Sequence, residues 1–358
     1  ACRSAPVVHA PGANPEATEP AGMAPIQDRN CRHMPAFETD LIVTVTPNPA
    51  VDVTVFVPAL HPGEVNTAAE ARESAGGKGI NVASCLADFG RRVAATGFLG
   101  KANEAIFARH LQSKGIADRF LRLEGATRTG IKVVDTTTNT TTDINLPGLG
   151  PDPRHVDALF DTVDGLVRPG RWFVLAGSLP PGLSDGFYRE LAARILHADG
   201  HVALDTSGNA LREGLRAGVT LAKPNLRELE WLCGTNLTEP DRILAAGEEL
   251  LASGIRTVVI SMGAEGALFL EDTQRLLVHP PATRVQSTVG AGDAMMAGMI
   301  AGACDGLDLA ARARRATAFS LDTLTRIGAH LDPARVQKIE AQLTIDNPDG
   351  AAESAAPG

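Results

Sequence analysis

STVGAGDAMMAG, at residues 287–298, places a glycine-rich turn and an acid at the start of an apolar helix. A helix N-terminus leaves backbone N–H groups without partners, and the helix dipole favours an anion there. We predict that Gly290, Ala291 and Gly292 form such an anion-binding turn. Asp293 follows directly, and its carboxylate can accept a proton from an attacking hydroxyl. The stretch therefore favours phosphoryl transfer, with a glycine turn capped by an acid as the alternative.

A second glycine cluster, SAGGKGINVA at residues 74–83, also runs from a loop into an apolar helix. It matches neither of two common phosphate-binding fingerprints. A Walker A loop needs Ser or Thr after its lysine, where this chain has Gly79, and a dinucleotide fingerprint needs a third glycine, where it has Val82. Two such turns in one chain predict a site for two substrates.

Both glycine loops resemble the signatures of the PfkB/ribokinase-type carbohydrate kinases, a Gly-Gly-Lys-Gly-x-Asn loop and a Gly-Ala-Gly-Asp loop. Further matches to the family are TPNPAVD at 46–52, GSLPPG at 177–182, KPNLREL at 223–229 and SMGAEG at 261–266. The resemblance covers about residues 41–343. It implies a ribokinase-like three-layer α/β fold, in which helices flank a mainly parallel central sheet and a small β-sheet forms a lid.

Composition and charge agree with a cytoplasmic enzyme. The chain has 358 residues, of which 44% are hydrophobic and 21% charged, and can bury one large core. Its net charge of −9 argues against a nucleic-acid or anionic-membrane partner. Its five cysteines are scattered without Cys-x-x-Cys spacing, which indicates a reducing compartment and no zinc site or disulfide framework. No run approaches the about twenty apolar residues of a membrane helix.

The resemblance implies a kinase domain at 41–345, between ends whose composition predicts disorder, 1–40 and 346–358. Short apolar runs predict buried parallel strands at 41–45, 172–176, 202–205, 221–223 and 257–261. Longer patterns predict helices at 79–89, 103–114, 184–198, 225–233, 240–253 and 292–304.

Two segments break this alternation of strands and helices. Residues 51–57 with 65–72, and residues 129–145, have the β-branched alternation expected of antiparallel strands. We therefore expect a discontinuous β lid at about 51–72 and 128–146, with an exposed surface hairpin as the alternative. The resemblance implies that this lid closes over the sugar and makes a homodimer contact.

Asp52 is the predicted sugar-binding acid. A carboxylate can accept hydrogen bonds from two neighbouring sugar hydroxyls, and the resemblance places the family's sugar-binding acid at this motif position. Gly76 and Gly77 are expected to let the sugar approach the backbone, and Asn81 to offer an amide partner. Lys78, at a helix start, is expected to face an anion.

Arg128 and Ser178 complete the predicted substrate-binding set. Arg128 begins the lid, where kinases of phosphorylated hexoses resemble each other in having an arginine, and a guanidinium can donate two parallel hydrogen bonds to phosphate. A sugar phosphate is therefore expected over a free sugar. Ser178 is expected to add a hydroxyl contact. The chain departs from the family pattern at two positions. Gly130 stands where Asn is usual, and Met295 stands at or near a position where the family usually has a small Ser.

The resemblance implies ATP and Mg²⁺ as cofactors. Asn225 and Glu228 stand one turn apart on a predicted helix, and the family uses this Asn-x-x-Glu pattern to hold Mg²⁺, mainly through water. A solvated helix face is the alternative for such a pair. The residues predicted to contact ATP are Lys223, Asn225, Ser261, Gly263, Ala264, Glu265, Gly266 and Gly292.

The acceptor follows from likeness to family members that act on ketohexose phosphates, which extends to GFLGK at 97–101 and TDIN at 142–145. We expect ATP-dependent phosphorylation of fructose 1-phosphate to fructose 1,6-bisphosphate. Tagatose 6-phosphate and fructose 6-phosphate are alternative acceptors, and a nucleoside or free sugar is a more distant one. A non-catalytic, sugar-phosphate-binding regulator is the alternative from another class of protein.

Overall fold

A computed structural model describes residues 40–346 except 139, 282, 284, 327 and 329. The two ends that are predicted to be disordered, 1–40 and 346–358, lie outside the described residues apart from Asp40 and Asp346. No helix in the described part of the chain is long and apolar enough to cross a membrane.

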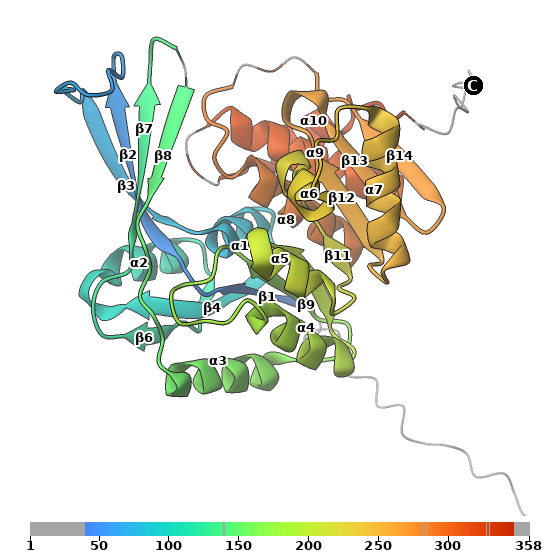
Figure 1. Cartoon of the computed structure of the whole chain (residues 1–358), viewed down its shortest axis with the longest axis horizontal. Coiled ribbons are helices and arrows are strands. Elements are labelled where there is room, and N and C mark those ends of the chain that lie inside the picture. The colour runs from blue at the N-terminus through green and yellow to red at the C-terminus, as the bar shows by residue number, and fades with distance from the viewer. Residues whose placement is uncertain are drawn as a thin grey trace, which may run out of the picture. The chain divides into compact units, whose positions relative to one another are not determined.

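A ten-stranded sheet forms the centre of the described structure (Figure 1). Its strands are β1 (Leu41–Thr46), β4 (Arg92–Gly100), β5 (Ala117–Asp118), β6 (Leu121–Leu123), β9 (Trp172–Ala176), β10 (His201–Asp205), β11 (Leu221–Ala222), β12 (Thr257–Ser261), β13 (Ala267–Glu271) and β14 (Gln274–Val278). The order is β14-β13-β12-β11-β10-β9-β1-β4-β5, with β6 also paired to β4. The β12–β13 and β13–β14 pairs are antiparallel and the others are parallel.

Helices cover both faces of this sheet because its strands are apolar on both sides. One face carries α1 (Lys78–Asp88), α2 (Ala105–Ser113), α8 (Ala291–Cys304), α9 (Leu309–Leu324) and α10 (Pro333–Glu340). The other carries α3 (Pro153–Leu166), α4 (Phe187–His197), α5 (Gly208–Leu215), α6 (Leu226–Cys233) and α7 (Pro240–Ala252). In β1, Ile42 packs into the first layer while Val43 and Val45 pack into the second. The predicted three-layer α/β fold is confirmed.

A separate four-stranded sheet, here called the small sheet, stands beside the layers (Figure 1). It consists of β2 (Ala50–Val57), β3 (Glu70–Gly76), β7 (Thr129–Asp135) and β8 (Thr140–Asn145), in the order β3-β2-β7-β8. The outer pairs are antiparallel, as predicted, and the central β2–β7 pair, which was not predicted from the sequence, is parallel. Both strands leave the carboxyl ends of parallel strands of the central sheet, β1 and β6, and so run in the same direction.

Strand β3 also differs from the prediction at 65–72. It begins at Glu70 and reaches Gly76, so the second glycine cluster starts inside a strand rather than in a loop. Its sequence, EARESAG, is largely polar and exposed and has no apolar alternation that marks a strand. The strand forms because these residues pair with β2. The elements that were not predicted from the sequence are β4, β5, β6, β13, β14, α3, α5, α9 and α10.

Candidate active site

The glycine turn lies at the N-terminus of helix α8, as the sequence predicts. Gly290 is the N-cap, and its φ of 82° is a left-handed conformation that glycine adopts at little cost. No side chain caps this end of the helix. Apart from a long hydrogen bond of 3.5 Å from the N–H of Ala291 to the carbonyl oxygen of Thr288, the first-turn N–H groups of α8 are therefore open to an anion.

A cavity of about 790 Å³, here called the larger cavity, lies against this helix end. Its walls include the residues that follow the carboxyl ends of β10, β11 and β12, the edge at which open α/β sheets bind ligands. Its volume falls within the range of about 300–1,000 Å³ that is typical of small-molecule sites. Of the residues predicted to contact the nucleotide, those that line it are Lys223, Asn225, Ser261, Gly263, Ala264, Gly266 and Gly292.

Asp205, the last residue of β10, is the acid at the centre of the larger cavity. Its Oδ1 lies 2.6 Å from Nζ of Lys78, and its Oδ2 lies 3.2 Å from Nζ of Lys223. Lys223 Nζ also lies close to Gly292 in the first turn of α8, since it would be 3.2 Å from a Cβ placed on that glycine. Because Lys78 binds the same carboxylate, both ammonium groups lie near the start of α8. Asp205 was not predicted from the sequence, although an acid that ends a buried strand at a parallel-sheet edge was the available signal.

The charges of this cluster are fixed by their mutual contacts. Burial alone would raise the pKa of Asp205, but the charges of Lys223 and Lys78 outweigh it and lower that pKa. Burial would likewise lower the pKa of Lys78, but the carboxylates of Asp205, Asp293 and Glu228 raise it instead. Two ammonium groups therefore share one central carboxylate beside a helix N-terminus, an arrangement suited to a polyphosphate.

Asp293 is buried in the first turn of α8, with 6% of its surface exposed. Nδ2 of Asn81 donates a hydrogen bond to its Oδ2 at 2.8 Å. Burial first, and the negative charge of Asp205 second, raise the pKa of Asp293 to about 6. At neutral pH the side chain is thus an ionised carboxylate that is more basic than an ordinary aspartate, as a general base requires.

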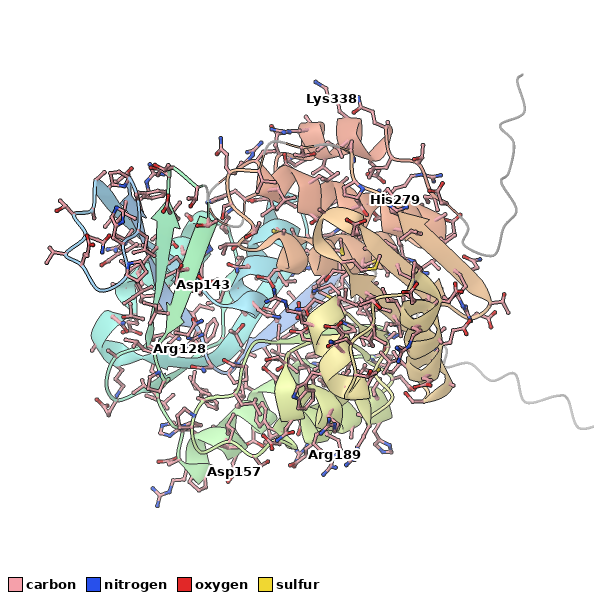
Figure 2. All side chains as sticks on the ribbon, turned by 45° about the horizontal axis from the view of Figure 1, so that its top comes forward. Arg128, Asp143, Asp157, Arg189, His279 and Lys338 are labelled. Atoms are coloured by element: carbon pink, nitrogen blue, oxygen red, sulfur yellow. The ribbon has the colours of Figure 1, made fainter. Side chains whose placement is uncertain are left out.

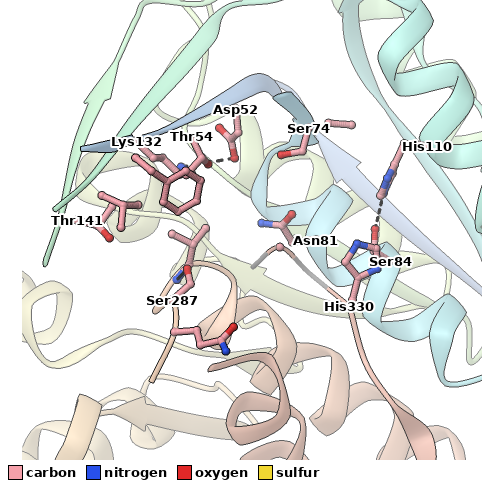
Figure 3. A pocket seen from close by; sticks show the side chains of 16 residues that line it. Asp52, Thr54, Ser74, Asn81, Ser84, His110, Lys132, Thr141, Ser287 and His330 are labelled. Carbon is pink, nitrogen blue, oxygen red and sulfur yellow. Dashed lines mark hydrogen bonds and ion pairs between the residues drawn. The ribbon is translucent and has the colours of Figure 1, made fainter. Parts of the chain in front are cut away.

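A smaller cavity, of about 90 Å³, lies under the small sheet (Figure 3). Asp52, Thr54 and Phe56 of β2 line it together with Asn81 of α1. Because Asn81 lines the smaller cavity and bonds Asp293, which lines the larger one, the two cavities meet at this hydrogen bond. The arrangement provides two compartments with one buried carboxylate at their junction.

Asp52 lies inside strand β2, with its carboxylate packed between two glycines. A Cβ on Gly76 would lie 2.3 Å from Oδ2 of Asp52, and a Cβ on Gly130 would lie 2.7 Å from Oδ1. Gly130, the first departure from the family pattern, thus makes room for this acid. Burial raises the pKa of Asp52 against the opposing charges of Lys132 and Arg128.

Arg128 lies just before β7 and outside the residues that line the two cavities (Figure 2). Its Nε and Nη2 donate to the carbonyl oxygen of Asn48, both at 3.3 Å. Its Nη1 donates to Oδ1 of Asn145 at 3.2 Å and to the carbonyl of Leu146 at 3.5 Å. These acceptors are uncharged, so the guanidinium ties together the two segments that flank the small sheet and keeps its positive charge.

Other predicted residues also lie beside the cavities rather than in their walls. Ser178 is exposed, and its hydroxyl accepts a hydrogen bond from Nδ2 of Asn48 at 3.1 Å. Lys78 lines the larger cavity instead of the sugar side where it was predicted. The remaining predicted residues outside both linings are Gly76, Gly77, Glu228 and Glu265.

Asn225 and Glu228, the predicted Mg²⁺ pair, form a reciprocal cap on helix α6. The backbone N–H of Glu228 donates to Oδ1 of Asn225, and that of Asn225 donates to Oε2 of Glu228, both at 2.9 Å. Within the described ranges no three His, Cys, Asp or Glu side chains form a group that could hold a metal directly. Because Oδ1 of Asn225 and Oε2 of Glu228 already accept these backbone hydrogen bonds, the two side chains fit an ion held through water better than one held directly.

Several lining residues of the smaller cavity were not found from the sequence. Ser84 and His110 are joined by a 2.7 Å hydrogen bond between Oγ and Nε2, and both line this cavity, as do Lys132 and His330 (Figure 3). They come from α1, α2, β7 and the segment before α10, and no local motif connects them.

Comparison with known proteins gives a consistent family match. A model described as "pfkB family carbohydrate kinase" matches residues 46–335. The 1-phosphofructokinases of Rhodobacter capsulatus and Xanthomonas campestris pv. campestris are 48% and 46% identical, and each match covers 85% of this chain and 97% of the relative. Phosphofructokinase-2 from Escherichia coli, solved with substrates and products, has a TM-score of 0.80 at 28% identity, over 84% of this chain and 98% of that one. A possible 1-phosphofructokinase from Thermotoga maritima has a TM-score of 0.76 at 25% identity, over 86% and 99%.

The raised pKa of Asp293 predicts a pH-dependent cost to stability. Because folding raises this pKa from 3.8 to about 6, the group stabilises the fold below the lower value, and that contribution is lost as the pH rises through the upper one. Asp293→Asn is neutral at every pH. We expect it to match the wild type near pH 4 and to exceed it by up to about 3 kcal/mol in free energy of unfolding above about pH 7.

Chemical denaturation at about pH 4, 6 and 8 measures this difference, with exposed Asp157→Asn as the control. A stability difference between Asp293→Asn and the wild type that does not grow with pH would contradict the prediction.

Proposed function

The chain belongs to the pfkB family of carbohydrate kinases, and we propose that it transfers the γ-phosphoryl group of ATP to fructose 1-phosphate, forming fructose 1,6-bisphosphate. The observation that carries this proposal is the Asn81–Asp293 hydrogen bond, which joins a cavity under the small sheet to a cavity at the N-terminus of α8. Relatives named 1-phosphofructokinase, up to 48% identical, support the choice of acceptor.

Asp293 is the proposed general base. Its carboxylate takes the proton of the attacking hydroxyl, while the hydroxyl oxygen bonds to the γ-phosphorus and the bond from that phosphorus to the ADP oxygen breaks. Its pKa of about 6 supports this role, since the group is ionised at neutral pH yet binds a proton more strongly than a free aspartate. Asn81 orients the carboxylate through its 2.8 Å hydrogen bond.

The start of α8 and two lysines are proposed to stabilise the transferring phosphoryl group. The N–H groups of Gly290, Ala291 and Gly292 provide fixed donors for charge that develops on the phosphoryl oxygens. Lys78 and Lys223 add positive charge beside this helix end, and their contacts with Asp205 fix where that charge lies. Such preorganised groups need no rearrangement at the moment of transfer.

The remaining nucleotide contacts are proposed along the larger cavity, through the segment that follows β12 and includes Ser261, Gly263 and Ala264. Asn225 and Glu228 are proposed to hold hydrated Mg²⁺. A bound Mg²⁺ ion supplies positive charge between the phosphates of ATP and offsets the repulsion between two anionic substrates.

The sugar phosphate is proposed to bind on the side of the smaller cavity. Asp52 and Asn81, which both line it, are placed to contact hydroxyls. Arg128 is proposed to contact the phosphate, because its uncharged acceptors leave its positive charge free to attract an anion. Gly76, Gly77 and Ser178 adjoin these groups.

We also propose that two copies of the chain pair through the small sheet. Val53 and Ile144 both pair with Ile131 across the strands, so all three point to one face, and Ile144 is 49% exposed. Asp52, Thr54 and Lys132 point to the opposite face, toward the smaller cavity. Val53 also packs against the core of the first layer, whereas Ile144 on the outer strand is exposed, so a second copy would meet the outer part of this face without blocking the site.

A substrate panel tests the proposed reaction. We expect MgATP-dependent ADP release with a kcat/KM for fructose 1-phosphate at least about tenfold above those for fructose 6-phosphate, tagatose 6-phosphate, free fructose and ribose. A preference for fructose 6-phosphate would move the chain to a sibling activity; a phosphofructokinase-2 from Escherichia coli, solved with that ligand, is 27% identical. No turnover with any sugar would favour the regulator.

Asp293→Asn tests the proposed base. We expect kcat to fall by about 10²–10⁴-fold while calorimetry still detects binding of both substrates, because the variant keeps the shape of the side chain and loses only its proton affinity. Near-normal kcat would remove Asp293 from this role.

Arg128 is tested by Arg128→Ala and Arg128→Lys. We expect Arg128→Ala to raise KM for fructose 1-phosphate by more than about tenfold with a smaller change in kcat, through loss of a charged phosphate contact. Arg128→Lys keeps the charge but loses the planar guanidinium, so its KM should lie between those of the wild type and Arg128→Ala. A lower melting temperature with unchanged KM would make Arg128 a structural tie only.

A further inference from the structure

Lys132 is a half-buried cation of the smaller cavity that neither sequence motif predicts. Among the described residues it is the one lysine or arginine that lines this cavity, and 15% of its side chain is exposed. It lies on β7 and points to the same side as Asp52, as Figure 3 shows. A charge held there at this depth needs a partner.

The partners of Lys132 are two acids on the neighbouring strands. Lys132 pairs with Asp143 of β8 across the sheet and with Thr54 of β2, and Asp52 lies two residues before Thr54 on the same face. Its Nζ lies 3.5 Å from Oδ2 of Asp52 and 3.6 Å from Oδ1 of Asp143. The ammonium group is thus shared between one acid in the cavity wall and one at the exposed edge strand.

We propose that Lys132 is a positioning residue for sugar recognition: it holds the Asp52 carboxylate toward the cavity as an acceptor for sugar hydroxyls, and Asp143 sets how firmly it does so. This inference rests on the proposed function, in which Asp52 contacts the sugar. Lys132 acts through Asp52 and not through the reacting atoms.

The charges around Asp52 support this role. Burial raises its pKa, the charge and hydrogen bond of Lys132 and the charge of Arg128 lower it, and the charge of Asp143 raises it. Strand β3 places the neutral Ser74 opposite Asp52, and α1 contributes the neutral Asn81 to the same cavity. Lys132 is therefore the main charge that opposes burial and keeps Asp52 a pure acceptor.

The same geometry argues against a direct phosphate contact for Lys132. One ammonium beside two carboxylates leaves the surroundings negative, and a phosphate dianion placed there would be repelled. Arg128, with its uncharged acceptors, is the better phosphate partner.

The test compares Lys132→Met, Lys132→Arg and Asp143→Asn with the wild type from about pH 5.5 to 8. Calorimetry gives the dissociation constant of fructose 1-phosphate, and steady-state kinetics give KM and kcat. An opposite charge within about 4–6 Å lowers a carboxyl pKa by about 1–3 units. Binding should weaken as the pH falls and Asp52 takes up a proton. In Lys132→Met, which lacks the lysine charge, we expect this weakening to begin about one pH unit or more above the pH at which it begins in the wild type. In Asp143→Asn the weakening of binding should begin at a lower pH than in the wild type, and in Lys132→Arg at the same pH. We expect kcat to be unchanged in all three variants.

Titration of the substrate phosphate, of Asp293, and of His110 and His330, which line the same cavity as Asp52, is common to every variant, so only differences in onset count. Exposed Lys101→Met serves as the control for loss of a lysine. Weakening that is equal at all pH values, with the onset unchanged, would make Lys132 a phosphate ligand and overturn the proposal. If Lys132→Met does not fold, the downward shift in Asp143→Asn still decides it. If the protein does not turn over fructose 1-phosphate but the variants still shift the pH at which binding weakens, the proposed reaction is wrong and this inference holds.

Discussion

The carboxylate of Asp205 holds the ammonium groups of Lys78 and Lys223 together, and the larger cavity depends on this three-residue contact. The contact joins the start of α1 to the ends of β10 and β11, and it faces the open N–H groups of α8. Without the carboxylate, the ammonium groups of the buried Lys223 and the half-buried Lys78 would repel each other at the place where an anion must bind. Asp205 also raises the pKa of Asp293, so one acid both organises the positive charge and makes the neighbouring acid more basic.

Helix α1 links the two halves of the site. Its first residue, Lys78, lines the larger cavity, and Asn81, one turn later, lines the smaller cavity and bonds Asp293. The second glycine cluster therefore does more than cradle one ligand, because it starts a helix whose first turn contributes to both compartments. The small sheet completes the sugar side with Asp52, for which two glycines leave room.

The sequence was informative where chemistry is local. The glycine turns and Asp293 could be predicted because a helix N-terminus and its first acid lie within a few residues of each other. Apolar periodicity predicted strands that alternate with helices, and the family resemblance implied the three layers. Asp205 was missed because an acid at a strand end has many ordinary roles, and only the approach of Lys78 and Lys223 from other elements distinguishes it. Strand β3 was misplaced because its polar residues are defined by pairing with β2. The Asn225–Glu228 spacing is satisfied by a helix cap, so it alone could not decide on a metal.

The parallel pairing of β2 with β7 has a consequence for how the chain folds. An antiparallel hairpin can close from its turn, but this pair joins Val51 to Thr129 across α1, β4 and α2. The entropy of closing so long a loop must be met before the pair gains any stability, unless the intervening elements already hold its ends close. The small sheet, which forms the wall of the proposed sugar compartment, therefore depends on contacts between distant parts of the chain. We expect it to form once the central layers have brought its strands together.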